Sequence, residues 1–95
     1  MKYVVQYVAP DELDMDAIME NFPAHQVRWK EYADAGTLLA IGPMADPSEG
    51  AMGIFTTREA AESFVAGDPF VLKGLMASYR ILEWREVLLP PLDPA

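Results

Sequence analysis

The chain has 95 residues, 52% of them hydrophobic, and a formal net charge of −8. This length and composition predict one folded domain with a hydrophobic core and exclude a disordered chain. The acidic balance argues against a nucleic-acid partner, and the absence of cysteine excludes disulfides, thiolate catalysis and cysteine-ligated metal sites.

The N-terminal segment predicts a strand over residues 2–9, which are mainly β-branched and aromatic. Tyr3, Val5 and Tyr7 share one face, and the opposite face is also mostly apolar, so we expect an inner strand covered on both sides. The segment has no signal-peptide pattern. No apolar run reaches the roughly 20 residues that a membrane span needs, so we expect a cytoplasmic protein without a membrane partner.

The next segment predicts helical structure. A polar loop over 11–15 leads into a short helical piece over 16–21. A longer helix is expected to begin at Pro23, because proline suits the first helical position, and to end at Gly36, which suits the left-handed position that closes a helix. Pro23 is expected to kink or interrupt the helical structure on its two sides.

The only histidine of the chain lies in this longer helix. His25, Trp29 and Tyr32 share one helix face, which is otherwise apolar. The imidazole is therefore expected to point toward the core or a pocket. A titratable side chain in such a place requires a polar partner.

The second half of the chain predicts three strands and a second helix. Strands are expected over 37–44, 51–57 and 78–88, with a turn-rich hairpin loop over 45–50. The glycine and proline that end the first of these strands break or bend it there.

The second helix is expected to start at Thr57, whose hydroxyl can accept a hydrogen bond from an early backbone N–H, and to stop at Gly67. A turn with a short helical piece follows over 68–76. The domain is expected to span residues 1–89. The proline-rich tail over 90–95 is expected to be extended and able to lie across a neighbouring subunit.

The order of elements predicts an α+β fold of the ferredoxin-like β-α-β-β-α-β type. An antiparallel sheet would carry two helices on one face. Because both faces of the first strand are apolar, we expect the free face of the sheet to be covered by the sheet of a second copy. The partner predicted on this ground is a homodimer formed by sheet-to-sheet packing.

Asp68 is the best candidate for the polar partner of His25. Glu31 and Asp34 lie on the same helix but off the histidine face, and Asp46 lies in the hairpin loop. Asp68 directly follows the second helix, which in the predicted fold lies beside the first, so its carboxylate could reach the imidazole.

A carboxylate beside an imidazole fixes its tautomer and raises the basicity of the other ring nitrogen, which suits general acid–base catalysis. Two plainer interpretations stay open. His25 could be a satisfied core histidine, and Asp68 could cap the turn that it forms with Pro69 and Phe70.

Several other residues are candidates for a pocket wall. Gly42 and Pro43 could form a backbone lip or simply end a strand, and Trp29 and Phe70 could stack on a substrate or belong to the core. Arg80 could hold a substrate carboxylate or form a structural ion pair. The methionines are scattered along the sequence, so we expect them to fill gaps in the core. No metal-ligand spacing and no cofactor-binding motif is present, so none is expected.

The chain resembles the YciI-like (YCII-related) family from Tyr3 to about Val87. A histidine, then Gly-Pro, then Asp-Pro-Phe form the characteristic combination. The matching segments are 23–25 (PAH), 35–43 (AGTLLAIGP), 59–71 (EAAESFVAGDPFV), 74–75 (GL) and 81–84 (ILEW).

This resemblance implies a dimeric α/β barrel of ferredoxin-like subunits and an active site centred on His25 and Asp68. Relatives share the general style of muconolactone isomerases, and one branch dehydrochlorinates a chlorinated hydroxyquinol. Many members also carry an arginine shortly before the histidine, where this chain has Asn21 and Phe22. The departure removes an anion-binding group.

We therefore predict a cofactor-independent lyase or isomerase that acts on a small cyclic or enolisable molecule. His25 would be the general base and Asp68 its orienting partner, with Trp29, Gly42, Pro43 and Phe70 lining the substrate pocket. The alternative is a non-catalytic, small-ligand-binding or stress-related homodimer. A cofactor-free oxygenase on the same barrel is a third possibility.

Overall fold

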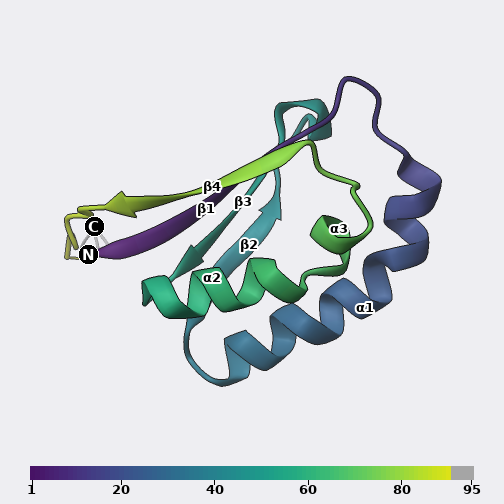
Figure 1. Ribbon diagram of the computed structural model, residues 1–95. Helices are drawn as coiled ribbons and strands as arrows, with labels where there is room; N and C mark the ends of the chain where they lie inside the picture. Colours follow the sequence, from purple (N-terminus) through teal and green to yellow (C-terminus); the bar gives the residue numbers. More distant parts are fainter. Residues whose placement is uncertain (91–95) are drawn as a thin grey trace, which may run out of the picture.

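The computed structural model describes residues 1–90 and has the predicted ferredoxin-like α+β topology (Figure 1). All neighbouring strands of its four-stranded sheet are antiparallel, and their order is β2-β3-β1-β4. The elements are β1 (Lys2–Val8), α1 (Met15–Asp34), β2 (Leu38–Pro43), the short 3-10 helix η1 (Pro47–Glu49), β3 (Ala51–Phe55), α2 (Arg58–Gly67), α3 (Pro69–Leu72) and β4 (Ser78–Trp84).

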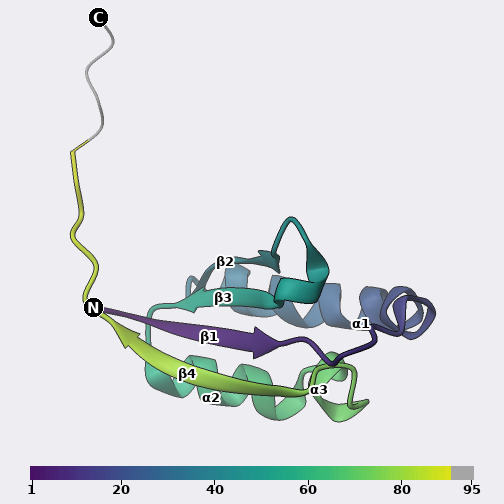
Figure 2. The same ribbon diagram turned by 90° about the horizontal axis from the view of Figure 1, so that it is seen from above.

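Two long helices, α1 and α2, cover one face of the sheet, as predicted (Figures 1 and 2). The core lies between these layers, because strand residues of one parity point toward the helices. It consists of Val5, Tyr7, Leu38, Phe55, Ala61, Phe64 and Val65. On the opposite face of the sheet, Val8, Leu82 and Trp84 remain 45%, 38% and 46% exposed.

The placement of Pro23 at the start of a helix is wrong. A single helix runs from Met15 to Asp34 with Pro23 inside it, and Figure 1 shows that α1 bends rather than stops. Proline removes only one backbone hydrogen bond from the ladder. Ile18 and Phe22, from the turns before it, line the same pocket as His25, so their packing continues the helix through the proline.

The ends of α1 follow from their capping residues. The Asp14 side chain accepts a hydrogen bond from the Ala17 N–H at 3.0 Å. At the other end Gly36 has a φ of 79°, and the Thr37 N–H donates to the Tyr32 carbonyl at 3.0 Å. This pairing satisfies a carbonyl of the last turn, so the predicted role of Gly36 is confirmed.

The remaining boundaries are close to the predicted ones. Thr57 caps α2 by accepting from the Ala60 N–H at 3.1 Å. β4 ends at Trp84, four residues short of the predicted end, because its only neighbour is β1 and Trp84 pairs with Lys2, at the very beginning of that strand. Of the predicted tail, residues 91–95 lie outside the described residues.

Candidate active site

Asp68 is the centre of the site. It lies between α2 and α3, and its side chain is fully buried. Its Oδ1 lies 2.8 Å from Nδ1 of His25 and accepts the Phe70 N–H at 3.1 Å, while its Oδ2 accepts the Tyr7 hydroxyl at 2.9 Å. Asp68 therefore caps the turn and also contacts the histidine. The interpretation of Asp68 as a turn cap and its interpretation as the partner of His25 are both compatible with the structure.

His25 is held in a single orientation. The residue is 7% exposed, and its ring stacks on the Phe70 ring with centroids 4.0 Å apart and planes 14° apart. Because a carboxylate oxygen only accepts, Nδ1 of His25 donates to Asp68 and carries the proton in the neutral imidazole. Nε2 has no hydrogen-bond partner within residues 1–90.

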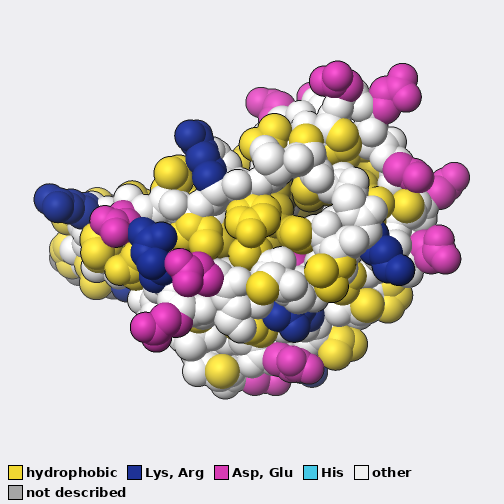
Figure 3. All heavy atoms as spheres, viewed as in Figure 1, with side chains coloured by type: hydrophobic (Ala, Val, Ile, Leu, Met, Phe, Trp, Pro, Cys, Tyr) yellow, Lys and Arg dark blue, Asp and Glu magenta, His cyan; other side chains and the backbone are white. Residues whose placement is uncertain are grey.

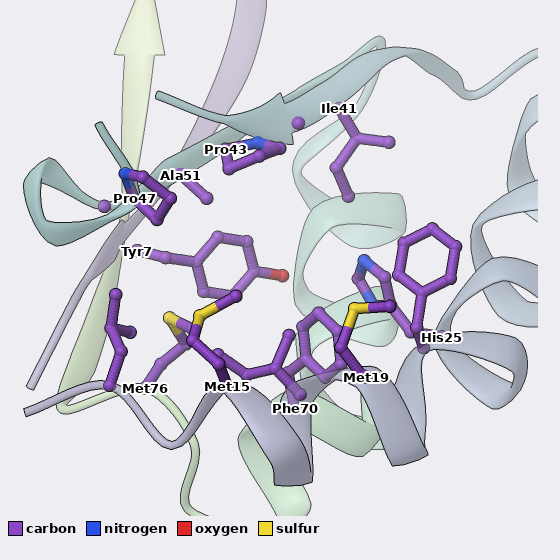
Figure 4. A pocket seen from close by; sticks show the side chains of 15 residues that line it. Tyr7, Met15, Met19, His25, Ile41, Pro43, Pro47, Ala51, Phe70 and Met76 are labelled. Carbon is purple, nitrogen blue, oxygen red and sulfur yellow. The ribbon is translucent and has the colours of Figure 1, made fainter. Parts of the chain in front are cut away.

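A cavity of about 250 Å³ adjoins the imidazole (Figure 4). Tyr7 and His25 are its only lining residues with a polar side chain, and Figure 4 shows them pointing toward one another at one side of the cavity. The lining residues are Tyr7, Leu13, Met15, Ile18, Met19, Phe22, His25, Ile41, Gly42, Pro43, Pro47, Gly50, Ala51, Phe70 and Met76. An apolar hollow with one basic nitrogen can hold a small molecule against a general base.

Tyr7 belongs to the site although the sequence did not single it out. Burial and the neighbouring Asp68 carboxylate raise the pKa of its hydroxyl well above the usual value for tyrosine. The hydroxyl therefore stays protonated and acts as a donor to Asp68. The strand periodicity placed Tyr7 on an apolar face, but nothing in the sequence marked its hydroxyl as a partner of a residue 61 positions away.

The other predicted site residues fall into two groups. Gly42, Pro43 and Phe70 line the cavity, whereas Trp29 does not and instead packs against the hydrophobic core. Trp29 shares the helix face of His25, but it lies one turn farther along α1 and is not among the residues that line the cavity. It is therefore left out of the proposed substrate contacts.

The remaining candidates for charge chemistry lie elsewhere. Arg80 donates to Gln6 at 2.6 Å on the face of the sheet opposite the helices. Asp46 accepts from the backbone and the hydroxyl of Ser48, and these hydrogen bonds lower its pKa. Glu31 and Asp34 are exposed on α1, so Asp68 is the only one of the four candidate carboxylates that meets His25.

The methionines correct one prediction. They are scattered in the sequence, yet Met15, Met19 and Met76 lie together along the cavity (Figure 4). Two come from α1 and one from the segment before β4. These side chains are flexible and adapt to ligands of different shape. Met15 and Met19 line the pocket instead of filling gaps in the core, whereas Met76 lines the pocket and also packs against the core.

Two kinds of feature are absent from residues 1–90. No group of three or more histidine, cysteine, aspartate or glutamate side chains in this range could hold a metal ion. None of its helices combines the length and the apolar character that crossing a membrane requires.

Comparison with known proteins agrees with the fold. The chain is similar to 5-chloro-2-hydroxyhydroquinone dehydrochlorinase from Burkholderia phenoliruptrix AC1100, whose structure was solved in complex with 2,5-dihydroxybenzoquinone. The match has a TM-score of 0.72 and 20% sequence identity, and it covers 92% of this chain and 96% of the other. No curated protein sequence matches the chain. The model of the YCII-related domain matches residues 1–85, so the chain belongs to the YCII-related family.

Proposed function

We propose that the protein is a cofactor-independent lyase or isomerase that uses His25 as general base and Asp68 as its orienting partner on a small cyclic or enolisable substrate. The observation that supports this most is the 2.8 Å contact between Asp68 Oδ1 and His25 Nδ1 beside an apolar cavity. The contact directs the lone pair of Nε2 away from Asp68 and toward a bound molecule.

The proposed reaction is a redox-neutral proton transfer. Nε2 of His25 takes a proton from a C–H or O–H group of the substrate, and Asp68 stabilises the imidazolium that forms. The electron pair left on the substrate forms a new π bond. In a lyase reaction a leaving group departs with its own electron pair, and in an isomerase reaction the imidazolium returns the proton to a different atom.

A non-catalytic ligand-binding protein is the competing function. The stacking of Phe70 on a histidine residue that is only 7% exposed favours it, because a histidine held in this way could serve solely to close the back of a binding cavity. Binding and catalysis are separable by measuring both on the same compound.

The decisive experiment measures chloride release from 5-chloro-2-hydroxyhydroquinone, the compound named for the structurally similar enzyme, together with turnover of a panel of lactones and enolisable ketones. We expect turnover by the wild type and a loss of about 10²–10⁴-fold in His25→Ala, the usual contribution of a general base. Asp68→Asn should lose activity as well, because an amide cannot stabilise the imidazolium.

Ligand binding by the same variants separates the two functions. If a compound is turned over equally by the wild type and His25→Ala, His25 is not the base. If compounds bind with a thermal shift but none is converted, the non-catalytic function holds. Circular dichroism of each variant verifies that the fold is retained.

We also propose that the protein is a homodimer formed through the open face of the sheet. Val8, Leu82 and Trp84 expose apolar surface there, and Val87, Leu88 and Leu89 after β4 are 78%, 82% and 79% exposed. Exposed apolar side chains on an uncovered sheet face favour an interaction site there. A second copy of the chain would cover it with an identical face.

A further inference from the structure

We propose that the cavity beside His25 selects uncharged, single-ring molecules and discriminates against ligands that carry a carboxylate. This inference names the substrate class of the proposed function and rests on it. Four features of the structure support the selectivity: the interior of the cavity, the engagement of Arg28, the charge of the surrounding segment and the cavity volume.

The side chains that line the interior offer one free polar atom. Of the two polar side chains in the lining, the Tyr7 hydroxyl already donates to Asp68, so Nε2 of His25 is the group left for a ligand. A carboxylate seated among the surrounding methyl, methionine and aromatic groups would lose its hydration, and no lysine or arginine of the lining would supply a counter-charge. Burying an unpaired charge in this way is costly, whereas a neutral hydroxyl needs only one hydrogen bond.

Arg28, the cation on α1 that is nearest to His25 in the sequence, is hydrogen-bonded to α2. Arg28 follows His25 by three residues, but its Nε donates to the Phe64 carbonyl at 3.1 Å and its Nη2 to the Ser63 carbonyl at 2.7 Å. Both carbonyls belong to α2, so the guanidinium joins the two helices. No lysine or arginine is among the residues that line the cavity.

The segment that forms part of the cavity wall is strongly acidic on its outer side. Residues 11–20 hold five exposed carboxylates and no basic side chain, and the same segment supplies Leu13, Met15, Ile18 and Met19 to the lining. Figure 3 shows acidic side chains along the edge where this loop and the first turns of α1 lie. The negative electrostatic potential of these carboxylates repels an approaching anion.

The volume limits the size of the ligand. A closed apolar cavity of about 150 Å³ holds a benzene molecule. The cavity of about 250 Å³ therefore takes one ring with a few small substituents. Flexible methionines on one side allow the substituents to vary.

The test compares benzyl alcohol, benzoate and benzylammonium, which are similar in shape and differ in charge. Binding is followed by chemical-shift changes of the His25 imidazole and of the Met15 and Met19 methyl groups in isotope-labelled protein. We expect benzyl alcohol to bind at least about tenfold more tightly than either ion at low salt. Raising the ionic strength should strengthen benzoate binding, because it screens the acidic segment.

Met19→Lys provides the matched variant, because it adds a cation at the cavity edge and Met19 is already 66% exposed. Benzoate should gain affinity in this variant while benzyl alcohol changes little. The proposal is overturned if benzoate binds the wild type as tightly as benzyl alcohol, or if benzyl alcohol fails to bind at millimolar concentration. If the probes bind with this selectivity but no compound of the turnover panel described above is converted, the catalytic function is overturned and the selectivity stands.

Discussion

At the scale of single residues, the site depends on how one buried carboxylate is satisfied. Asp68 is fully buried and receives hydrogen bonds from a side chain of β1, a side chain of α1 and the backbone of α3. A buried carboxylate without such partners would be strongly destabilising. The three contacts fix its position and thereby the orientation of the imidazole.

We expect Tyr7→Phe to lower the free energy of unfolding by about 1–3 kcal/mol near neutral pH, because Oδ2 of Asp68 loses its donor in a buried place. Above pH of about 10, tyrosine ionises in the unfolded chain, whereas the raised pKa keeps Tyr7 protonated in the folded protein. The folded state then binds more protons, so wild-type stability falls with rising pH, by up to about 1.4 kcal/mol per pH unit. The difference in the free energy of unfolding between the wild type and Tyr7→Phe should therefore become smaller as the pH rises.

Urea unfolding between pH 8 and 11 measures this difference. Tyr3→Phe is the matched control, since Tyr3 lies on the same strand and its hydroxyl makes no hydrogen bond within residues 1–90, so its removal should give no narrowing. A wild-type advantage over Tyr7→Phe that stays constant across this range would contradict the predicted role of the hydroxyl.

At the scale of elements, the hairpin between β2 and β3 is fitted tightly against β1. Gly50 follows η1 with a φ of 97°, and a Cβ atom there would collide with the Tyr7 carbonyl oxygen. Gly50 also lines the cavity and accepts a hydrogen bond from the Met44 N–H at 2.8 Å. The loop is thereby fixed at one edge of the site.

Gly50→Ala should destabilise the protein by at least about 1–3 kcal/mol, since both the backbone conformation and the contact with β1 exclude a side chain. Gly42→Ala is the control within the same hairpin. A Cβ at Gly42 meets no atom within 4 Å, so its effect should stay within about 0.5 kcal/mol. Thermal or urea unfolding of both variants measures the contrast, and equal losses would contradict it.

At the scale of the whole molecule, the sheet is covered on one side only. The helices lie on one side of the sheet (Figure 2). That side carries Val5 and Tyr7, and the other side presents Leu82 and Trp84 from β4. A chain of 95 residues gains buried apolar area by association, which small domains need for stability.

Trp84→Glu should convert the proposed dimer into a monomer, because it replaces an apolar indole on the open face of the sheet with a charge that the interface would bury. The mass that light scattering measures during gel filtration should fall from twice the chain mass of 10.5 kDa in the wild type to the mass of a single chain in the variant. Val27→Glu, which changes a 61% exposed side chain on α1, should leave the dimer intact. A wild type that is monomeric at micromolar concentration would contradict the interface.

Much of the candidate site was within reach of the sequence, for identifiable reasons. The position of His25 on an apolar helix face follows from local periodicity, and the order of elements brings the loop at Asp68 near that helix. The resemblance to a family of known chemistry then joined the two residues. Pro23 was misplaced because a local helix-start preference was outweighed by packing on both sides of it.

The sequence by itself determined the order of the strands and main helices, their apolar faces and the caps at Thr57 and Gly36, because these depend on residues a few positions apart. The tertiary structure alone decided that Tyr7 donates to Asp68, that Trp29 lies outside the cavity and that three scattered methionines meet along its wall. Such contacts depend on strand order, register and the angle of helices on the sheet. These properties are set by the packing of the whole chain, and no local pattern encodes them.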